Sequence, residues 1–183
     1  MPQAEVPEVR FSFDDAYPIY PRPQVKNAAL VHIPLLEEGG DLPTFIRPEW
    51  GGVQVFYGDY YAIVKDGEVI YGSAKEQWEA MHTETYPGSG SWIKTAVPLA
   101  YRASEACRIV TLIPDESGAI KEASFVLKPQ DWIVRQPGGE VQHIKAEKYP
   151  TIYFTPAEAV ELGLTQMSAT EFADWATYHL TYA

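Results

Sequence analysis

Two pairs of carboxylates with the same spacing are the clearest candidates for chemistry in this sequence. Asp59 is followed by Glu68, and 72 residues further on Asp131 is followed by Glu140. Paired carboxylates can act as general acid and general base, for example on a glycosidic bond. Each pair brackets a glycine turn, however, and a catalytic pair rarely needs two copies in one small chain. We therefore interpret both pairs as structural and expect that the protein is not an enzyme.

Histidine, cysteine and serine patterns provide no second candidate for catalysis. The sequence has four histidines in no HxH, HExxH or cysteine-containing spacing, so it predicts no metal ion: His32, His82, His143 and His179. The single cysteine, Cys107, lies in the apolar run SEACRIVTLI and is expected to be a buried strand residue. No serine occupies a GxSxG motif, and we expect no cofactor.

The acidic composition limits the possible partners. The 183-residue chain has 25 Asp and Glu against 14 Lys and Arg, a formal net charge of −11, which argues against direct nucleic-acid binding. Its hydrophobic content of 46% predicts a packed core, but no apolar run reaches the roughly 18 residues of a membrane helix. The first residues lack the features of a signal peptide. We expect a cytoplasmic protein that binds a protein partner or itself, as a homo-oligomer.

An internal repeat gives the architecture. Setting Asp59 on Asp131 produces five identities in sixteen positions, the others being Gly67 on Gly139, Glu68 on Glu140, Val69 on Val141 and Ala74 on Ala146. Upstream, VKNAALV from Val25 matches IKTAVPL from Ile93. Downstream, Trp78 falls on Tyr149 and His82 on Tyr153. We expect two copies of one module, produced by internal duplication.

Each copy is expected to be a small, mostly antiparallel β module. In the first copy Asp66 and Gly67 separate two β-rich runs and predict a tight hairpin turn. In the second copy Gly138 and Gly139 follow a proline at the same place. A further hairpin is expected in CRIVTLIPDESGAIKEASFVL, and a shorter or bulged one in LPTFIRPEWGGVQVFYG, which prolines and a Gly-Gly pair interrupt.

The remaining segments are assigned by composition. Residues 1–24 are rich in proline and aromatic residues and should form an extended arm. The modules are expected at 25–87 and 93–157, and 88–92, GSGSW, is expected to be the linker between them because it lacks a phosphate-loop motif. Two capped helices are expected within 158–183, where Ser168 precedes Glu171 by three residues, as Thr155 precedes Glu158. The fold class is therefore α+β.

The repeated segments FYGDYYAIVKDGEVIYGSAKEQWEAMH and KPQDWIVRQPGGEVQHIKAEKYPTIY resemble the PGDYG type of small domain and related phage-borne modules. The lead-in KTAVPLAY is similar to the start of such modules. These families have no established activity. The resemblance therefore implies a β fold and a bacterial or phage setting, and it implies no reaction.

Aromatic side chains are the best candidates for an interface. An exposed tyrosine favours interfaces, and Tyr60 and Tyr61 point to opposite faces of a strand, so we expect one of them to be exposed. The candidate interaction residues are Tyr57, Tyr60, Tyr61, Trp132, Phe172, Trp175 and His179.

Three functions follow from these observations. The first is a non-enzymatic interaction or assembly protein of bacterial or phage origin. The second is an anti-defence or inhibitor protein whose acidic surface occupies a basic nucleic-acid or nucleotide site, and its binding would depend strongly on salt. The third is a small-molecule-binding or hydrolytic enzyme with a site in a cleft between the modules.

Overall fold

The computed structural model describes residues 6–10, 13, 16–33, 44–48, 51–114 and 120–182. The chain divides into two units, and each unit is made of two separate stretches of sequence. The first unit comprises Met1–Arg22 and Ala96–Phe172, and the second comprises Pro23–Thr95 and Ala173–Ala183. The sheets are mostly antiparallel and helices follow them along the chain, which confirms the α+β class.

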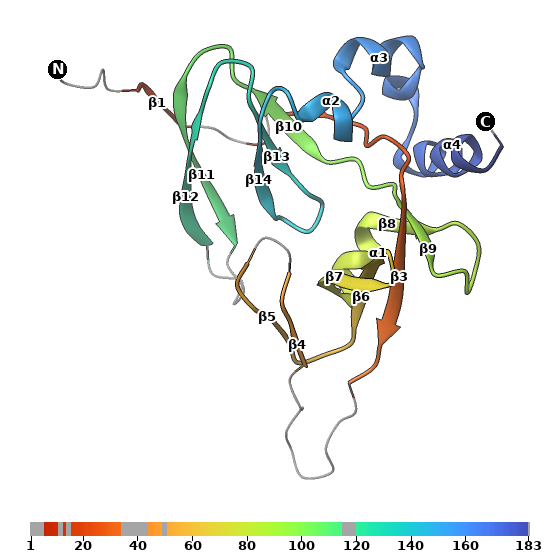
Figure 1. The fold of residues 1–183 in the computed structure, drawn as a ribbon. Helices are drawn as coiled ribbons and strands as arrows, with labels where there is room; N and C mark the ends of the chain where they lie inside the picture. Colours follow the sequence, from red (N-terminus) through yellow and green to blue (C-terminus); the bar gives the residue numbers. More distant parts are fainter. Residues whose placement is uncertain are drawn as a thin grey trace. The chain divides into compact units, whose positions relative to one another are not determined.

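The second unit is built on a five-stranded sheet with the order β7-β6-β3-β9-β8 (Figure 1). Its strands are β3 (Val25–Val31), β6 (Tyr60–Lys65), β7 (Glu68–Ala74), β8 (His82–Glu84) and β9 (Ser91–Lys94). The helix α1 (Lys75–Met81) covers one face of this sheet through the buried Trp78. A two-stranded ribbon, β4 (Thr44–Ile46) and β5 (Gln54–Phe56), packs on the other face through Ile46 and Phe56.

The first unit repeats this plan around a four-stranded sheet with the order β14-β13-β10-β2. Its strands are β2 (Tyr17–Pro18), β10 (Leu99–Arg102), β13 (Trp132–Arg135) and β14 (Val141–Ile144). A second sheet adds β1 (Glu8–Arg10), β11 (Cys107–Pro114) and β12 (Ile120–Leu127), and its predicted turn residues lie outside the described part of the chain. One face of the main sheet packs on α2 (Tyr149–Ile152), and the other packs on β11 and β12 around Cys107, which is buried as expected.

The predicted helix caps are present. Thr155 and Glu158 form a reciprocal capping box at the start of α3 (Pro156–Glu161), and Gly163 ends that segment with φ +72°. Ser168 and Glu171 do the same for α4 (Ala169–Tyr182). In both caps the hydroxyl and the carboxylate satisfy amides that the first helical turn leaves unpaired. A short 3-10 helix, η2 (Leu164–Gln166), lies between the two helices.

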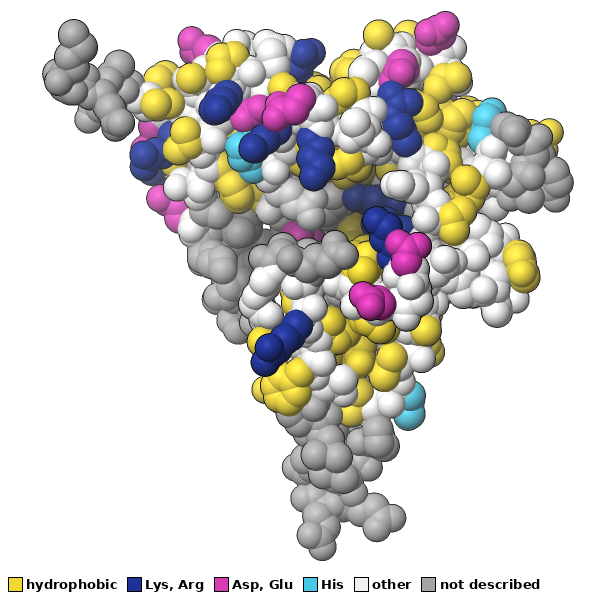
Figure 2. Space-filling model, in the orientation of Figure 1, with side chains coloured by type: hydrophobic (Ala, Val, Ile, Leu, Met, Phe, Trp, Pro, Cys, Tyr) yellow, Lys and Arg dark blue, Asp and Glu magenta, His cyan; other side chains and the backbone are white. Residues whose placement is uncertain are grey.

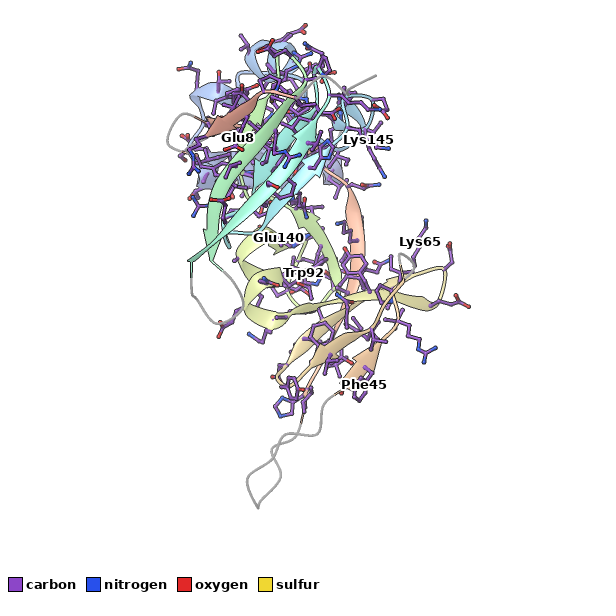
Figure 3. All side chains as sticks on the ribbon, turned by 90° about the vertical axis from the view of Figure 1, so that its left-hand side faces the viewer. Glu8, Phe45, Lys65, Trp92, Glu140 and Lys145 are labelled. Atoms are coloured by element: carbon purple, nitrogen blue, oxygen red, sulfur yellow. The ribbon has the colours of Figure 1, made fainter. Side chains whose placement is uncertain are left out.

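The predicted glycine turns are also present, and the second turn is one residue longer than the first. Asp66 and Gly67 form a two-residue turn with φ of +53° and +83°, which joins β6 to β7. The β13–β14 turn is one residue longer, and there Gly139 takes φ +91°. Figure 3 labels Lys65 and Glu140, which flank the two turns. Glycine is favoured at Gly67 and Gly139 because side chains avoid this region of φ.

The two units share their order of elements. Each has a strand, a hairpin that packs on one sheet face, a second strand, a glycine turn, a third strand and a short helix. Equivalent ring contacts join Tyr61 to Trp78 and Trp132 to Tyr149, which gives a spacing of 132 − 61 = 149 − 78 = 71 residues for these elements. Asp59 and Asp131, like Gly67 and Gly139, are 72 residues apart, so the spacing changes by one residue along the repeat. The two units thus have a common order of elements, and internal duplication stays a prediction.

Two predicted boundaries are wrong because strands pair outside their own repeat. Residues 88–92 are no linker, since Ser91 and Trp92 begin β9, which pairs with β3 and β8 in the second unit. Val25 and Ile93, matched as counterparts in the sequence, lie directly opposite each other across β3 and β9. Residues 17–22 of the predicted arm belong to the first unit, because β2 pairs with β10 and Pro21 bridges to Tyr153.

Two further observations complete the fold. Among the helices that the structure describes, none combines the length and the apolar character needed to cross a bilayer. Within the same residues, no group of three His, Cys, Asp or Glu side chains is arranged to hold a metal ion.

Candidate functional site

Asp59, the first carboxylate of the repeat, is occupied by backbone and histidine contacts. Its carboxylate accepts hydrogen bonds from Nδ1 of His32 at 2.9 Å and from the amide of Ile33 at 3.0 Å. These two bonds lower the pKa of Asp59, so the carboxylate is ionised over the neutral range. Glu68 lies at the exposed start of β7. The pair therefore does not converge on one reacting position.

Asp131 is held more tightly. Its carboxylate is 5% exposed and accepts from the amides of Lys128 and Ala146, both at 3.0 Å, and from Nε2 of His143 at 2.8 Å. Burial raises the pKa of Asp131, but these three hydrogen bonds outweigh burial and hold it below its usual value. The contacts to Lys128 and Ala146 close the connections on either side of the β13–β14 hairpin, so the structural interpretation of this residue is supported.

Each aspartate thus orients an imidazole, as in hydrolases that use a histidine base. A hydrolase of that type also needs a nucleophile bonded to the imidazole. Among the described residues, neither His32 nor His143 contacts a serine, threonine or cysteine hydrogen-bonding group. The two Asp–His pairs can fix local structure, and their geometry supplies no nucleophile.

Four of the candidate interaction residues lie in the core, which corrects the prediction for them. Tyr60 is 4% and Tyr61 6% exposed, because the ribbon covers one face of their sheet and α1 covers the other. The expectation that one of these tyrosines is exposed assumed a sheet with one bare face. Trp132, 3% exposed, stacks on Tyr149, and Phe172 is fully buried against Tyr20.

The other three candidates have different surroundings. Trp175 is half-buried on α4, and its ring stacks on His179 with the centroids 4.0 Å apart. Nδ1 of His179 donates to the carbonyl oxygen of Trp175, so this exposed imidazole is fixed to its own helix. Tyr57, at 64%, is the one exposed residue among the six Tyr, Trp and Phe candidates.

Tyr57 belongs to a larger apolar surface on the ribbon. Alternate residues of β4 and β5 and their extensions point away from the sheet, with Phe45 directly opposite Val55. The exposed fractions are 63% for Phe45, 53% for Val53, 40% for Val55 and 64% for Tyr57, and Arg47 is exposed beside them. We call these five residues the outer ribbon face. Figure 2 shows hydrophobic and basic side chains over β4 and β5, and Figure 3 labels Phe45 at the outer side of the ribbon.

The opposite side of the ribbon is fixed to the sheet. Phe56 stacks on Tyr60 with the ring centroids 4.4 Å apart. The side-chain amide of Gln54 bonds to both backbone groups of Gly72 in β7. Two-stranded ribbons are marginal by themselves, so this inner face is what presents the outer ribbon face in a fixed form.

Sequence reasoning missed Phe45, Val53 and Val55, although a signal was present. In the run VQVFY, Val53, Val55 and Tyr57 alternate with Gln54 and Phe56. This period of two residues is typical of a half-buried strand. The prolines and the Gly-Gly pair in this segment predict an interrupted hairpin and hide the strand pattern. The two strands, β4 and β5, are also only three residues long, so the pattern is short.

Comparisons with protein-family models, with curated proteins and with solved structures gave no match to this chain. The resemblance of the repeated segments to PGDYG-type domains therefore stays a prediction, and the candidate site is argued from its geometry alone.

Proposed function

We propose that this is a non-enzymatic assembly protein that binds a second copy of itself through the outer ribbon face. The observation that carries the proposal is the group of four exposed apolar side chains on that face: Phe45, Val53, Val55 and Tyr57. Singly exposed apolar residues are normal, whereas contiguous ones mark interaction surfaces. Tyrosine and phenylalanine are also among the residues that concentrate binding energy.

Charge favours a second copy as the occupant. The chain carries a net charge of −11, so two copies repel each other across most acidic surfaces. The outer ribbon face contains no acidic residue among its five members and carries one cation, Arg47. These five residues can therefore meet their counterparts in a second acidic chain without placing one carboxylate of the set against another. In a two-fold dimer the same face would meet itself, and apolar side chains satisfy this requirement without a complementary partner.

We also infer a setting for this assembly. A bacterial or phage origin and a cytoplasmic location remain part of the proposal, since a reducing compartment fits a chain with one buried cysteine. The acidic-inhibitor alternative differs in its salt response. Binding through the outer ribbon face is apolar and should persist at high salt, whereas occupation of a basic site should weaken.

Sedimentation and light scattering over a concentration series test the proposal. The wild-type chain should self-associate, and Phe45→Lys should weaken the association at least about tenfold, because losing a central aromatic contact typically costs more than 1 kcal/mol. Val126→Lys is the matched control, since Val126 is a 55% exposed strand residue of the first unit. A wild-type chain that stays monomeric at its highest soluble concentration, or equal effects of the two variants, would refute the proposal.

A further inference from the structure

A pocket of about 230 Å³ is lined by residues of the first unit. Three segments form it: β2 and the residues after it, the segment from the first residue of α2 through α3, and η2. Its lining consists of Tyr17, Pro18, Ile19, Tyr20, Tyr149, Phe154, Pro156, Ala159, Val160 and Thr165. Four of these residues are aromatic and none is charged.

The aromatic walls are held in place by neighbours outside the pocket. Tyr149 stacks on Trp132 with the ring centroids 3.8 Å apart, and its hydroxyl donates to the carbonyl oxygen of Phe154. The ring of Tyr17 packs edge-on against the same tryptophan. Because these rings are fixed by packing, the pocket exists without a ligand, as binding sites for small molecules commonly do.

The guanidinium that contacts the lining residue Phe154 is already paired. The guanidinium of Arg22 lies over the ring of Phe154, 4.8 Å from its centroid. The same group pairs with Glu158 and donates to the carbonyl oxygen of Pro150, both at 2.6 Å. A charged ligand would therefore lose its hydration without finding an opposite charge in the pocket, which disfavours it strongly.

Tyr20 is one of the hydroxyl-bearing residues of the lining, with Tyr17 and Thr165. Tyr20 is 4% exposed and packs edge-on against Phe172. Within the described part of the chain its hydroxyl makes no hydrogen bond. Burial raises the pKa of Tyr20, so the phenol is neutral and can both donate and accept. The hydroxyl can therefore pair with a polar group of a bound ligand.

We propose that this pocket binds one neutral, planar aromatic ring that carries a single hydrogen-bonding group, which pairs with the hydroxyl of Tyr20. The volume is below the roughly 300–1,000 Å³ of pockets for drug-sized ligands, so one ring system fits and a larger ligand does not. Aromatic walls favour offset stacking and edge-to-face packing of such a ring. The ring can belong to a free small molecule or to an aromatic side chain of a protein. This inference goes beyond the proposed function and does not depend on it.

Titration of the full chain with indole and with N-acetyl-tryptophanamide, followed by NMR, tests the inference. Indole should bind and shift resonances of the lining residues. Comparable binding of N-acetyl-tryptophanamide would identify a protein side chain as the source, whereas binding of indole alone would identify a free small molecule. Each result supports the proposal. Failure of both probes to bind the wild-type chain would overturn it.

Three variants locate the binding. Val160 is 67% exposed on α3 and lines the pocket, so Val160→Trp should fill the space and reduce indole affinity at least about tenfold, equivalent to roughly 1.4 kcal/mol. Tyr20→Phe should reduce the affinity about threefold to tenfold through loss of one hydrogen bond. Glu161→Trp, on the same helix but outside the lining, is the control and should bind as the wild type. Unchanged affinity in both Val160→Trp and Tyr20→Phe would overturn the proposal.

Discussion

The side-chain amide of Gln54 bonds to both backbone groups of Gly72: Nε2 donates to the carbonyl oxygen at 3.1 Å, and Oε1 accepts from the amide at 2.8 Å. Since β7 is an edge strand of its sheet, Gln54 occupies the place of a neighbouring strand. Open edge strands invite pairing with other chains. One side chain thus fastens the ribbon and protects the edge of the sheet at this point.

Removing this amide should loosen the ribbon. We expect Gln54→Ala to lower the free energy of unfolding by about 1–3 kcal/mol, as two hydrogen bonds are lost. Gln54→Glu retains the acceptor but not the donor and should give a smaller loss at neutral pH. Denaturant unfolding measures both values. An unchanged midpoint in Gln54→Ala would contradict the anchoring role.

Gly72 itself is required by a close approach. A Cβ at this position would lie 2.7 Å from Cε2 of Phe56 and 2.9 Å from Cδ1 of Ile46, so the ribbon would have to move. We expect Gly72→Ala to destabilise the protein by about 1–3 kcal/mol. Gly138→Ala is the matched control, because a Cβ there meets nothing within 4 Å and its φ is ordinary. Equal thermal midpoints for the two variants would disprove the packing argument.

The two aspartates of the repeat should differ in importance. Asp131→Asn should lower stability at pH 7 by about 2 kcal/mol, the usual range for hydrogen bonds to a buried charge. The loss from Asp59→Asn should be smaller, since Asp59 is more exposed and makes fewer bonds. The pKa of Asp131 is depressed in the folded state. Its contribution is therefore present above the unfolded pKa near 4 and is lost as the pH falls through the folded value. Unfolding of both variants at pH 7 and pH 3 measures these terms.

His82 should make stability depend on pH in mildly acidic solution. It is buried against Trp78, and burial, together with Lys26 and Lys94, lowers its pKa from 6.5 to about 3, although a hydrogen bond to the carbonyl oxygen of Trp78 opposes this. Below pH 6.5 the imidazole of His82 binds a proton in the unfolded chain, whereas in the folded chain it stays neutral down to about pH 3. Stability should thus be complete above pH 6.5 and fall by up to about 1.4 kcal/mol per pH unit below it.

The variant His82→Phe isolates this effect. It keeps a ring on Trp78 but binds no proton, so the difference in unfolding free energy between pH 6.5 and pH 5 should shrink. An equally steep pH dependence in the variant would assign the effect to other groups.

Trp92 distinguishes a strand from a linker. Because Trp92 is 8% exposed and packs edge-on against both Tyr61 and Trp78, we expect Trp92→Ala to destabilise the protein by about 3 kcal/mol. Tyr86→Ala, at a 67% exposed position before β9, should stay within about 0.5 kcal/mol of the wild type. A tolerated Trp92→Ala would restore the interpretation of 88–92 as a linker.

Features that depend on neighbouring residues could be predicted from the sequence. The turn at Asp66 and Gly67 needs positive φ, and the caps at Thr155 and Ser168 need a hydroxyl three residues before a carboxylate, so each signal lies within a few positions. Helix α1 also depends on neighbouring residues, but the sequence does not predict it. Its first residues follow a strand directly, and no side chain caps its N-terminus.

Features that depend on distant pairing could not be predicted. The burial of both Tyr60 and Tyr61 requires covers on two faces of the sheet, and these come from the ribbon and from α1. The pairing of β9 with β3 joins segments whose similarity in sequence indicated equivalence and not contact. For the candidate site, sequence reasoning found Tyr57 but not the strand partners that extend it into a surface.

The pairing of β2 with β10 has a consequence for synthesis on the ribosome. β2 emerges before its partner β10, because Leu99–Arg102 follows only after the main segment of the second unit, Pro23–Thr95. At roughly 5–20 residues per second, the nascent strand waits several seconds for its neighbour. Prolines at Pro18, Pro21 and Pro23 carry no amide hydrogen, so they make the waiting segment a poor template for strands of other emerging chains. These prolines thus reduce mispairing of the nascent β2 segment until Leu99–Arg102 has been translated.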